Sequence, residues 1–324
     1  MQRPRALVVG SVAFDMIFGI HGKIQDEILV EKDGKLGRQN LMFTAKTRSP
    51  EQISRGEICT GGHSWGGTGG NIAYGLGLLK KKPLLFSLAG KDFEGSGFGP
   101  HLKKSGVDSR VVVDEKSWTA IFYGMSDELG QQIGVYQPNA YENVHTLPLS
   151  KTISPKEFKD IGVAIFSAGT GMSILRHMRE AREKCGKNTT LIFDPGQVIS
   201  VFYDKALLEK TLALADIFMG NEVEIQQLQT ILGYNIPTLL KKGVRAVIET
   251  LGEKGSVIYE QGKTTKIKAI KAKKVVEATG AGDAYRAGMI AKLLEGKSLK
   301  EACESGSKVG ALSVAYRGGQ TYKV

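Results

Sequence analysis

Short apolar runs alternate with stretches of helical apolar spacing along most of the chain. The apolar runs predict buried strands, and apolar residues three and four positions apart predict amphipathic helices. The alternation predicts an α/β fold with a doubly wound, mostly parallel sheet flanked by helices. The predicted strands span residues 6–10, 84–88, 163–166, 191–193, 217–219 and 246–248, with a hairpin at 257–259 and 264–269. The predicted helices begin near residues 72, 92, 173, 205, 222, 283 and 299.

Two segments depart from this alternation. Residues 18–64 hold short alternating stretches separated by charged residues, among them 27–31, 41–44 and 57–59. Residues 119–137 have the pattern of a β-hairpin. Because the chain shows no interdomain linker, we expect one domain over residues 1–324, with these two segments inserted as a small β-strand lid.

The charge balance raises the question of nucleic-acid binding. The 324 residues include 44 Lys and Arg against 33 Asp and Glu, a formal net charge of +11. The densest lysine group, within residues 263–274, is interleaved with Thr, Ile and Ala, which is typical of a lysine-protected edge strand. This distribution disfavours nucleic-acid binding as the main role and favours attraction of an anionic nucleotide.

Cysteine usage and the N-terminus indicate the compartment. Cys59, Cys185 and Cys303 lie far apart, and no pair has metal-ligand spacing, which indicates a reducing setting. The apolar run at residues 6–10 is too short for a signal peptide or a membrane span. We therefore expect a cytoplasmic protein that does not associate with membranes.

Two glycine turns open predicted helices. Residues 279–283 read Thr-Gly-Ala-Gly-Asp, and residues 66–71 read Gly-Gly-Thr-Gly-Gly-Asn. Glycine allows tight turns, and a helix N-terminus offers free N–H groups to an anion such as phosphate. Asp283 would repel that anion, so its presence makes sense if it orients a hydroxyl that attacks phosphate. The competing interpretation is that Asp283 and Asn71 only cap their helices.

Several polar groups follow predicted strands. Asp15 comes after the first strand, and three motifs follow later ones: Asp194-Pro195-Gly196-Gln197, Asn221-Glu222-Val223-Glu224 and Thr250-Leu251-Gly252-Glu253-Lys254-Gly255. Open α/β sheets bind ligands at the carboxyl edge of their strands. Asn221 followed by Glu224 also fits a capping box, which needs no ligand. Several such groups at one edge, with two glycine turns, favour a site.

Together these motifs resemble the ribokinase family, also called the phosphofructokinase-B family. The segments 66–71 and 279–283 resemble its N-terminal and C-terminal signatures, and the segments 221–224 and 250–255 resemble two intermediate motifs. The resemblance covers nearly the whole chain and implies a ribokinase-like fold. It also implies an ATP-dependent kinase that uses Mg²⁺.

Other details resemble the adenosine kinase branch of bacteria and archaea. They are the segments 10–15, 66–74 and 193–197, together with Gln132-Ile133 and Tyr136. Position 68 is Thr, where ribokinases tend to carry Lys. This resemblance implies transfer of the ATP γ-phosphate to the 5′-hydroxyl of a ribonucleoside, with adenosine as the expected acceptor and AMP as the product of purine salvage.

The resemblance also implies roles for individual residues. Asp283 would accept the proton of the attacking hydroxyl, and the backbone at Gly280, Ala281 and Gly282 would stabilise the transferred phosphoryl group. The remaining implied residues are Asp15, Gly67, Thr68 and Asn71 for the acceptor, Asn221, Thr250, Gly252 and Gly255 for ATP, and Glu224 for Mg²⁺ through water.

Alternatives stay open at this stage. A sugar kinase of the same family, acting on ribose, fructose or a sugar phosphate, is the nearest one, and a non-catalytic nucleoside or sugar sensor is another. The family usually has Asp-Thr where this chain has Glu277-Ala278, a segment that helps hold a monovalent cation in some members, so potassium activation is left open. The chain could be a monomer or a homodimer paired through the lid strands.

Overall fold

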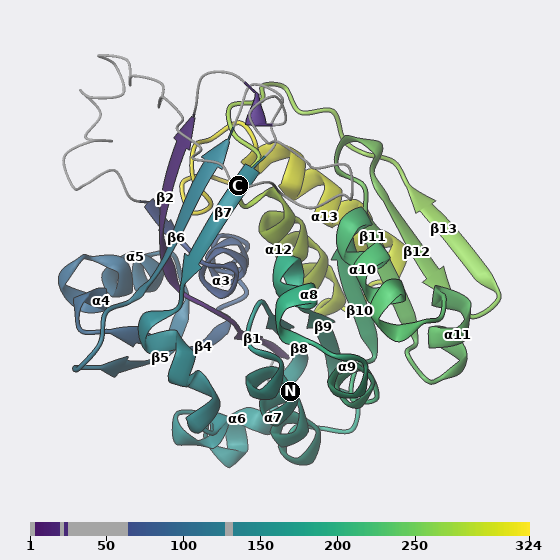
Figure 1. The fold of residues 1–324 in the computed structure, drawn as a ribbon, viewed down its shortest axis with the longest axis horizontal. Helices are drawn as coiled ribbons and strands as arrows, with labels where there is room; N and C mark the ends of the chain where they lie inside the picture. The colour runs from purple at the N-terminus through teal and green to yellow at the C-terminus, as the bar shows by residue number, and fades with distance from the viewer. Residues whose placement is uncertain (1–3, 20–22, 25–63, 127–131) are drawn as a thin grey trace, which may run out of the picture.

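The structure, a computed structural model, describes residues 4–19, 23–24, 64–126 and 132–324. Nine strands form its larger sheet (Figure 1). In spatial order they are β13 (Lys263–Ile267), β12 (Ser256–Glu260), β11 (Ala246–Thr250), β10 (Ile217–Asn221), β9 (Thr190–Asp194), β8 (Ile161–Ser167), β1 (Arg5–Val9), β4 (Leu84–Gly90) and β5 (Asp108–Asp114). All neighbours from β11 to β5 are parallel, and β12 and β13 are antiparallel. The predicted mostly parallel sheet is confirmed, although β5 was not predicted.

Helices cover both faces of this sheet, as its buried strands require. In β1, Ala6 and Val8 face one apolar cluster, and Leu7 and Val9 face the other. The first cluster is covered by α3 (Thr68–Leu78), α4 (Asp92–Gly95), α5 (Phe98–Lys104), α12 (Ala281–Leu293) and α13 (Leu299–Ser313). The second is covered by α6 (Pro155–Lys159), α7 (Gly171–Lys184), α8 (Ile199–Phe202), α9 (Lys205–Leu212), α10 (Glu222–Leu232) and α11 (Ile236–Lys241). Short 3₁₀ helices span Asn139–Thr146, Leu149–Lys151, Gly196–Val198 and Gly252–Lys254.

A second, smaller sheet contains the described parts of the expected lid. Its order is β3 (Ser64–Gly66), β2 (Ala13–Gly19), β6 (Ala120–Ser126) and β7 (Gln132–Gln137). β6 and β7 pair antiparallel, as the predicted hairpin requires. The sheet begins at Ala13, before the predicted start at residue 18, because the chain passes from β1 into β2 after only three residues. The predicted lid stretches 27–31, 41–44 and 57–59 lie outside the described residues.

Helices α3 and α12 lie side by side under one face of the larger sheet (Figure 1). Gly75 of α3 lies so close to α12 that a Cβ there would be 2.6 Å from the Cβ of Ala287 and 2.4 Å from the hydroxyl of Tyr322. The two helices begin at the two glycine turns, so their packing fixes how the turns face each other. Within the described chain, no helix has both the length and the apolar character needed to cross a membrane.

Candidate active site

The turn before α12 presents free backbone donors. Gly280 adopts φ 78°, and a Cβ there would lie 2.7 Å from the Cα of Gly319, so only glycine fits. The N–H of Ala281 donates to the carbonyl of Ala278 at 3.0 Å. In the part of the chain that the structure describes, the N–H groups of Gly282 and Asp283 have no protein acceptor. These two donors, and not Ala281, are therefore the ones that the turn offers to an anion.

Close backbone packing accounts for glycines in the turn before α3. Gly67 adopts φ 79°, and a Cβ there would lie 2.6 Å from the carbonyl oxygen of Ser11. A Cβ on Gly69 would lie 2.5 Å from the carbonyl carbon of Gly10. The hydroxyl of Thr68, between them, accepts a hydrogen bond from Ser167 at 3.2 Å. These glycines bring α3 against the segment that joins β1 to β2, whether or not a ligand is bound.

The buried side chain of Asn71 connects the two turns. Its Nδ2 donates to Oδ2 of Asp283 at 2.8 Å, and its Oδ1 accepts from Nε2 of Gln320 at 3.1 Å. Gln320 also donates to the carbonyl of Gly66 at 3.3 Å. The capping interpretation of Asn71 is wrong, because α3 begins after Gly67 and Asn71 makes no capping bond. Asn71 instead fixes the carboxylate of Asp283 relative to the other turn.

Asp15 lies beside this pair, although not where the sequence placed it. It was expected just past the first strand, but it belongs to β2 of the smaller sheet, where it is 6% exposed. Its carboxylate stands over the Cα of Gly66, where a Cβ would lie 1.9 Å from Oδ2. Burial raises the pKa of Asp15 to about 8, repulsion from Asp283 and Glu277 raises it too, and the N–H of Gly67 lowers it.

A buried ion pair lies behind Asp283. Both guanidinium nitrogens Nε and Nη2 of Arg286 donate to the carboxylate of Asp194, at the carboxyl end of β9. Burial raises the pKa of Asp283 to about 7, whereas Arg286 and the hydrogen bond from Asn71 lower it. The charges of Asp194 and Glu224 raise it further. One arginine thus faces three carboxyl groups, which is more acidic groups than it can neutralise when all three are ionised.

The predicted nucleotide residues gather at the carboxyl ends of β10 and β11. Asn221 and Thr250 are paired in register across these strands. Asn221 and Glu224 form both bonds of a capping box, so that interpretation is confirmed in geometry. Glu224 is 5% exposed, and burial raises the pKa of its carboxyl group. A surface cap gains nothing from such burial, so the capping box leaves the position of this carboxylate unexplained.

Gly252 and Gly255 differ in their surroundings. Gly255 has φ 100°, and a Cβ there would lie 2.1 Å from the carbonyl oxygen of Ile267. Packing of the hairpin β12–β13 is therefore enough to require glycine at position 255. Gly252 has φ 56°, and a Cβ there would meet no atom of the described residues within 4 Å. Of the two, Gly252 is the glycine with room beside its backbone for a ligand.

A magnesium ion carried by a nucleotide fits this donor set. Among the described residues, no three His, Cys, Asp or Glu side chains cluster as a protein metal cage. Mg²⁺ does not need one, because it commonly keeps several waters and takes one or two carboxylates plus phosphate oxygens. Oε2 of Glu224 accepts from the N–H of Asn221 at 2.7 Å. Oε1 receives no hydrogen bond from the described chain, so it is available to accept one from a water.

Sequence reasoning missed two residues of the site. Arg286 stands within the predicted helix, three positions after Asp283, and had no assigned role. Its guanidinium lies against the turn, since a Cβ on Gly282 would be 2.7 Å from its Nη1. Gln320 is 2% exposed near the C-terminus, and only the adjacent Gly318-Gly319 signalled a close backbone approach there. The order of the chain does not show that either residue faces Asp283.

Comparisons with a family profile and with individual proteins point to the same family. The profile of the pfkB family of carbohydrate kinases matches residues 35–323. A nucleoside kinase from Methanocaldococcus jannaschii is 30% identical over 273 residues, which cover 84% of this chain and 86% of that protein. A nucleoside kinase from Methanothermobacter thermautotrophicus is 32% identical over 262 residues, which cover 79% and 80%.

Solved structures are similar as well. The nucleoside kinase of Burkholderia thailandensis in complex with inosine has a TM-score of 0.80 at 27% identity, and the match covers 98% of this chain and 93% of that one. The M. jannaschii enzyme, described as an archaeal member of the ribokinase family, has a TM-score of 0.78 at 25% identity over 99% of this chain and 94% of that one. Sugar kinases also match, including a ribokinase from Haemophilus influenzae at 25% identity, with 82% of this chain and 87% of that protein covered. The predicted ribokinase-like fold is confirmed.

The Asp15→Asn variant should become more stable than the parent chain as pH rises. The folded state binds the Asp15 proton more tightly than the unfolded state, because its pKa is raised from 3.8 to about 8. Stability is therefore lost between these two values and stays low above the second. We expect the variant to match the parent below about pH 4 and to exceed it by on the order of 2 kcal/mol near pH 9. Urea unfolding across this range measures the difference, and a difference that does not change with pH would contradict the burial argument.

Proposed function

The chain belongs to the pfkB family of carbohydrate kinases, and on this basis we propose that it is an ATP-dependent nucleoside kinase. It transfers the γ-phosphate to the 5′-hydroxyl of a ribonucleoside, and adenosine is the acceptor we expect. The observation that carries the proposal is the hydrogen bond from Asn71 to Asp283. It holds a carboxylate beside two free N–H groups, where a hydroxyl and a phosphoryl group can meet.

Asp283 would orient the attacking hydroxyl and accept its proton. A pKa of about 7 in the ligand-free chain makes this carboxylate a better base than an ordinary aspartate. In a loose phosphoryl-transfer transition state the proton leaves late, so orientation by Asn71 matters as much as basicity. The N–H groups of Gly282 and Asp283 would stabilise the charge that develops on the phosphoryl group.

The acceptor would lie between the smaller sheet and α3. Asp15 and Asn71 would hydrogen-bond the ribose hydroxyls, with the backbone of Gly67 and the hydroxyl of Thr68 close by. Burial makes Asp15 costly in the free protein, and such a cost is typical of residues kept for binding. The smaller sheet would then exclude water, which could otherwise accept the phosphate. Its edge strands β3 and β7 have no further strand partner among the described residues, so homodimerisation through the lid remains part of the proposal.

ATP would lie along the carboxyl ends of β10 and β11. Asn221 would be near the phosphates, while Thr250, Gly252 and Gly255 would line the nucleotide. Glu224 would hold a water on Mg²⁺, and the ion would neutralise part of the phosphate charge. The proposal includes activation by potassium. The buried Oε1 of Glu277 has no partner in the described chain, so it is an oxygen that could bind a cation. Cysteine usage supports a cytoplasmic location.

Two considerations favour a nucleoside over a free sugar. The nucleoside kinases of the two archaea are 30% and 32% identical to this chain, whereas the ribokinase is 25% identical. Thr68 stands where ribokinases tend to carry Lys, and its hydroxyl is held by Ser167. The choice of adenosine depends on the segments that resemble the adenosine kinase branch.

An acceptor panel tests the proposal directly. ATP turnover with Mg²⁺ is followed in a coupled assay with adenosine, inosine, guanosine, cytidine, ribose, fructose, fructose 6-phosphate and no acceptor, with and without potassium. We expect a nucleoside to be preferred, and adenosine among the nucleosides. Preference for a sugar would keep the fold and the role of Asp283 but reject the nucleoside assignment. No turnover with any acceptor would favour a sensor.

Glu224→Gln should weaken the response to magnesium. Loss of one negative charge next to the metal-bound water should raise the Mg²⁺ concentration for half-maximal turnover by about tenfold. Glu222→Gln is the matched control, because Glu222 is in the same first turn of α10 and carries the same charge but is exposed. Equal magnesium curves for the two variants would remove Glu224 from the metal site.

A further inference from the structure

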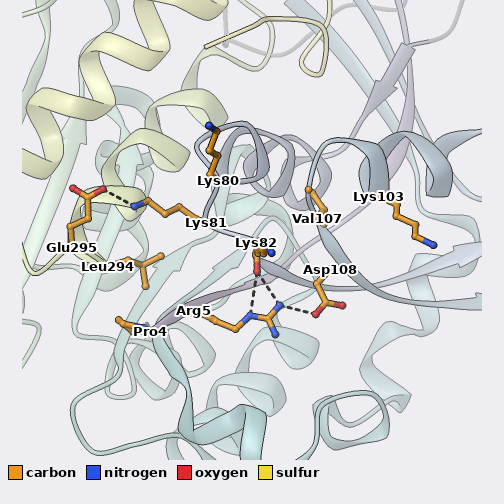
Figure 2. A pocket seen from close by; sticks show the side chains of 11 residues that line it. Pro4, Arg5, Lys80, Lys81, Lys82, Lys103, Val107, Asp108, Leu294 and Glu295 are labelled. Atoms are coloured by element: carbon orange, nitrogen blue, oxygen red, sulfur yellow. Dashed lines mark hydrogen bonds and ion pairs between the residues drawn. The ribbon is translucent and has the colours of Figure 1, made fainter. Parts of the chain in front are cut away.

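A hollow of about 960 Å³ lies at the opposite end of α3 and α12 from the candidate active site. It is bordered by Lys80, Lys81 and Lys82, which follow α3, by Lys103 at the end of α5, and by Glu295, which follows α12 (Figure 2). Its volume is at the upper end of the range for small-molecule sites. The kinase reaction proposed above makes no use of it.

The acidic groups at the hollow are already neutralised. Oε1 of Glu295 accepts from Lys81 at 2.6 Å and its Oε2 from Lys292 at 2.7 Å, and these bonds lower the pKa of Glu295 to about 2. Asp108 is bonded by Arg5 and by Arg110. Figure 2 shows Lys81 extended toward Glu295 and Arg5 placed between Asp108 and the carbonyl of Lys82. Each carboxylate therefore has two cationic partners and can neutralise no further lysine.

Three lysines at the hollow remain uncompensated. Lys80, Lys82 and Lys103 are exposed, and none has an acidic partner among the residues that the structure describes. Two of them occupy strained backbone, since φ is 59° at Lys80 and 47° at Lys82. Glycine would adopt these angles without the cost of about 1 kcal/mol per residue. The chain thus places positive charge where local conformation favours glycine.

Stabilisation of the end of α3 is the simplest competing explanation, because cations favour helix C-termini. Two carbonyls in the last turn of α3, those of Gly77 and Leu76, already accept from the N–H groups of Lys80 and Lys81, however. Lys103 is in the last turn of α5 and borders the same hollow. Helix stabilisation accounts for each lysine at its own helix end, but it does not account for the ends of two helices that meet with unpaired lysines at one concavity.

We propose that this hollow binds a small phosphate-bearing anion. Unpaired ammonium groups recognise phosphate as point charges, and no aromatic side chain among the lining residues is available to stack on a base. Recognition therefore acts on the phosphate groups themselves. The site is separate from the phosphate donors before α12, because α3 and α12 run from the candidate active site at their N-termini to the hollow at their C-termini.

Lysine footprinting of the whole chain tests the proposal. Acetylation rates are measured by mass spectrometry without ligand, with inorganic pyrophosphate and, in a second arm, with ADP. We expect acetylation of Lys80, Lys82 and Lys103 to slow by about tenfold, while the exposed lysines Lys116, Lys187 and Lys241 keep their rates. Protection by pyrophosphate is the expected result and assigns recognition to the phosphate groups, whereas protection by ADP without protection by pyrophosphate would contradict recognition of phosphate alone. The proposal would be overturned if neither ligand slowed the acetylation of Lys80, Lys82 and Lys103 relative to the three control lysines.

A matched pair of variants provides the second measurement. Lys80→Gln/Lys82→Gln/Lys103→Gln should bind pyrophosphate about tenfold more weakly by calorimetry, at low ionic strength where exposed charges are least screened. Lys116→Gln/Lys187→Gln/Lys241→Gln changes net charge equally and should bind as the parent does. The KM for ATP should stay the same in both, since neither variant alters the candidate active site. Equal loss of pyrophosphate binding in both variants would show a general charge effect and reject the site.

Discussion

The hydrogen bond from Asn71 to Asp283 is the interaction on which the candidate site depends. It joins two residues 212 positions apart in the chain and ties the first turn of α3 to the first turn of α12. Close packing of the two helices at Gly75 and Ala287 brings these turns within reach of each other. Gln320 fixes the other side of the Asn71 amide. The glycines of the two turns thus allow close backbone contacts, and these contacts hold the Asp283 carboxylate at the turn before α12. The N–H groups of Gly282 and Asp283 in this turn have no acceptor among the described residues.

The electrostatics of the site complement this geometry. Asp194, Glu224 and Asp283 share one arginine, and burial raises the pKa of both Glu224 and Asp283. A polyphosphate would be repelled by such a group of carboxylates unless a divalent cation accompanied it. A nucleotide that enters as its magnesium complex would avoid this repulsion. At the far ends of the same helices, three lysines of the hollow have no acidic partner among the described residues, which is why phosphate recognition is proposed there without a metal ion.

Much of this architecture could be predicted from sequence. The β-strand runs of the larger sheet and the helical spacing after each glycine turn depend on local periodicity, which the chain shows clearly. Asp15 was misplaced because a three-residue connection moves it into a second sheet, and no local pattern shows such a change of sheet. Arg286 and Gln320 were missed for a related reason: their roles come from contacts with Asp194 and Asn71, far away in sequence. Gly255 ends the motif at residues 250–255, and the packing of the β12–β13 hairpin is enough to require glycine at this position.

The central claim is that Asp283 acts in the chemical step, and rapid-quench measurement of a single turnover with Asp283→Asn tests it most directly. The substitution keeps the size of the side chain and an oxygen for Asn71 but removes the proton acceptor. We expect the rate of phosphoryl transfer to fall by about 10³-fold or more, while ADP binding changes by less than about threefold. A transfer rate close to that of the parent chain would contradict the account.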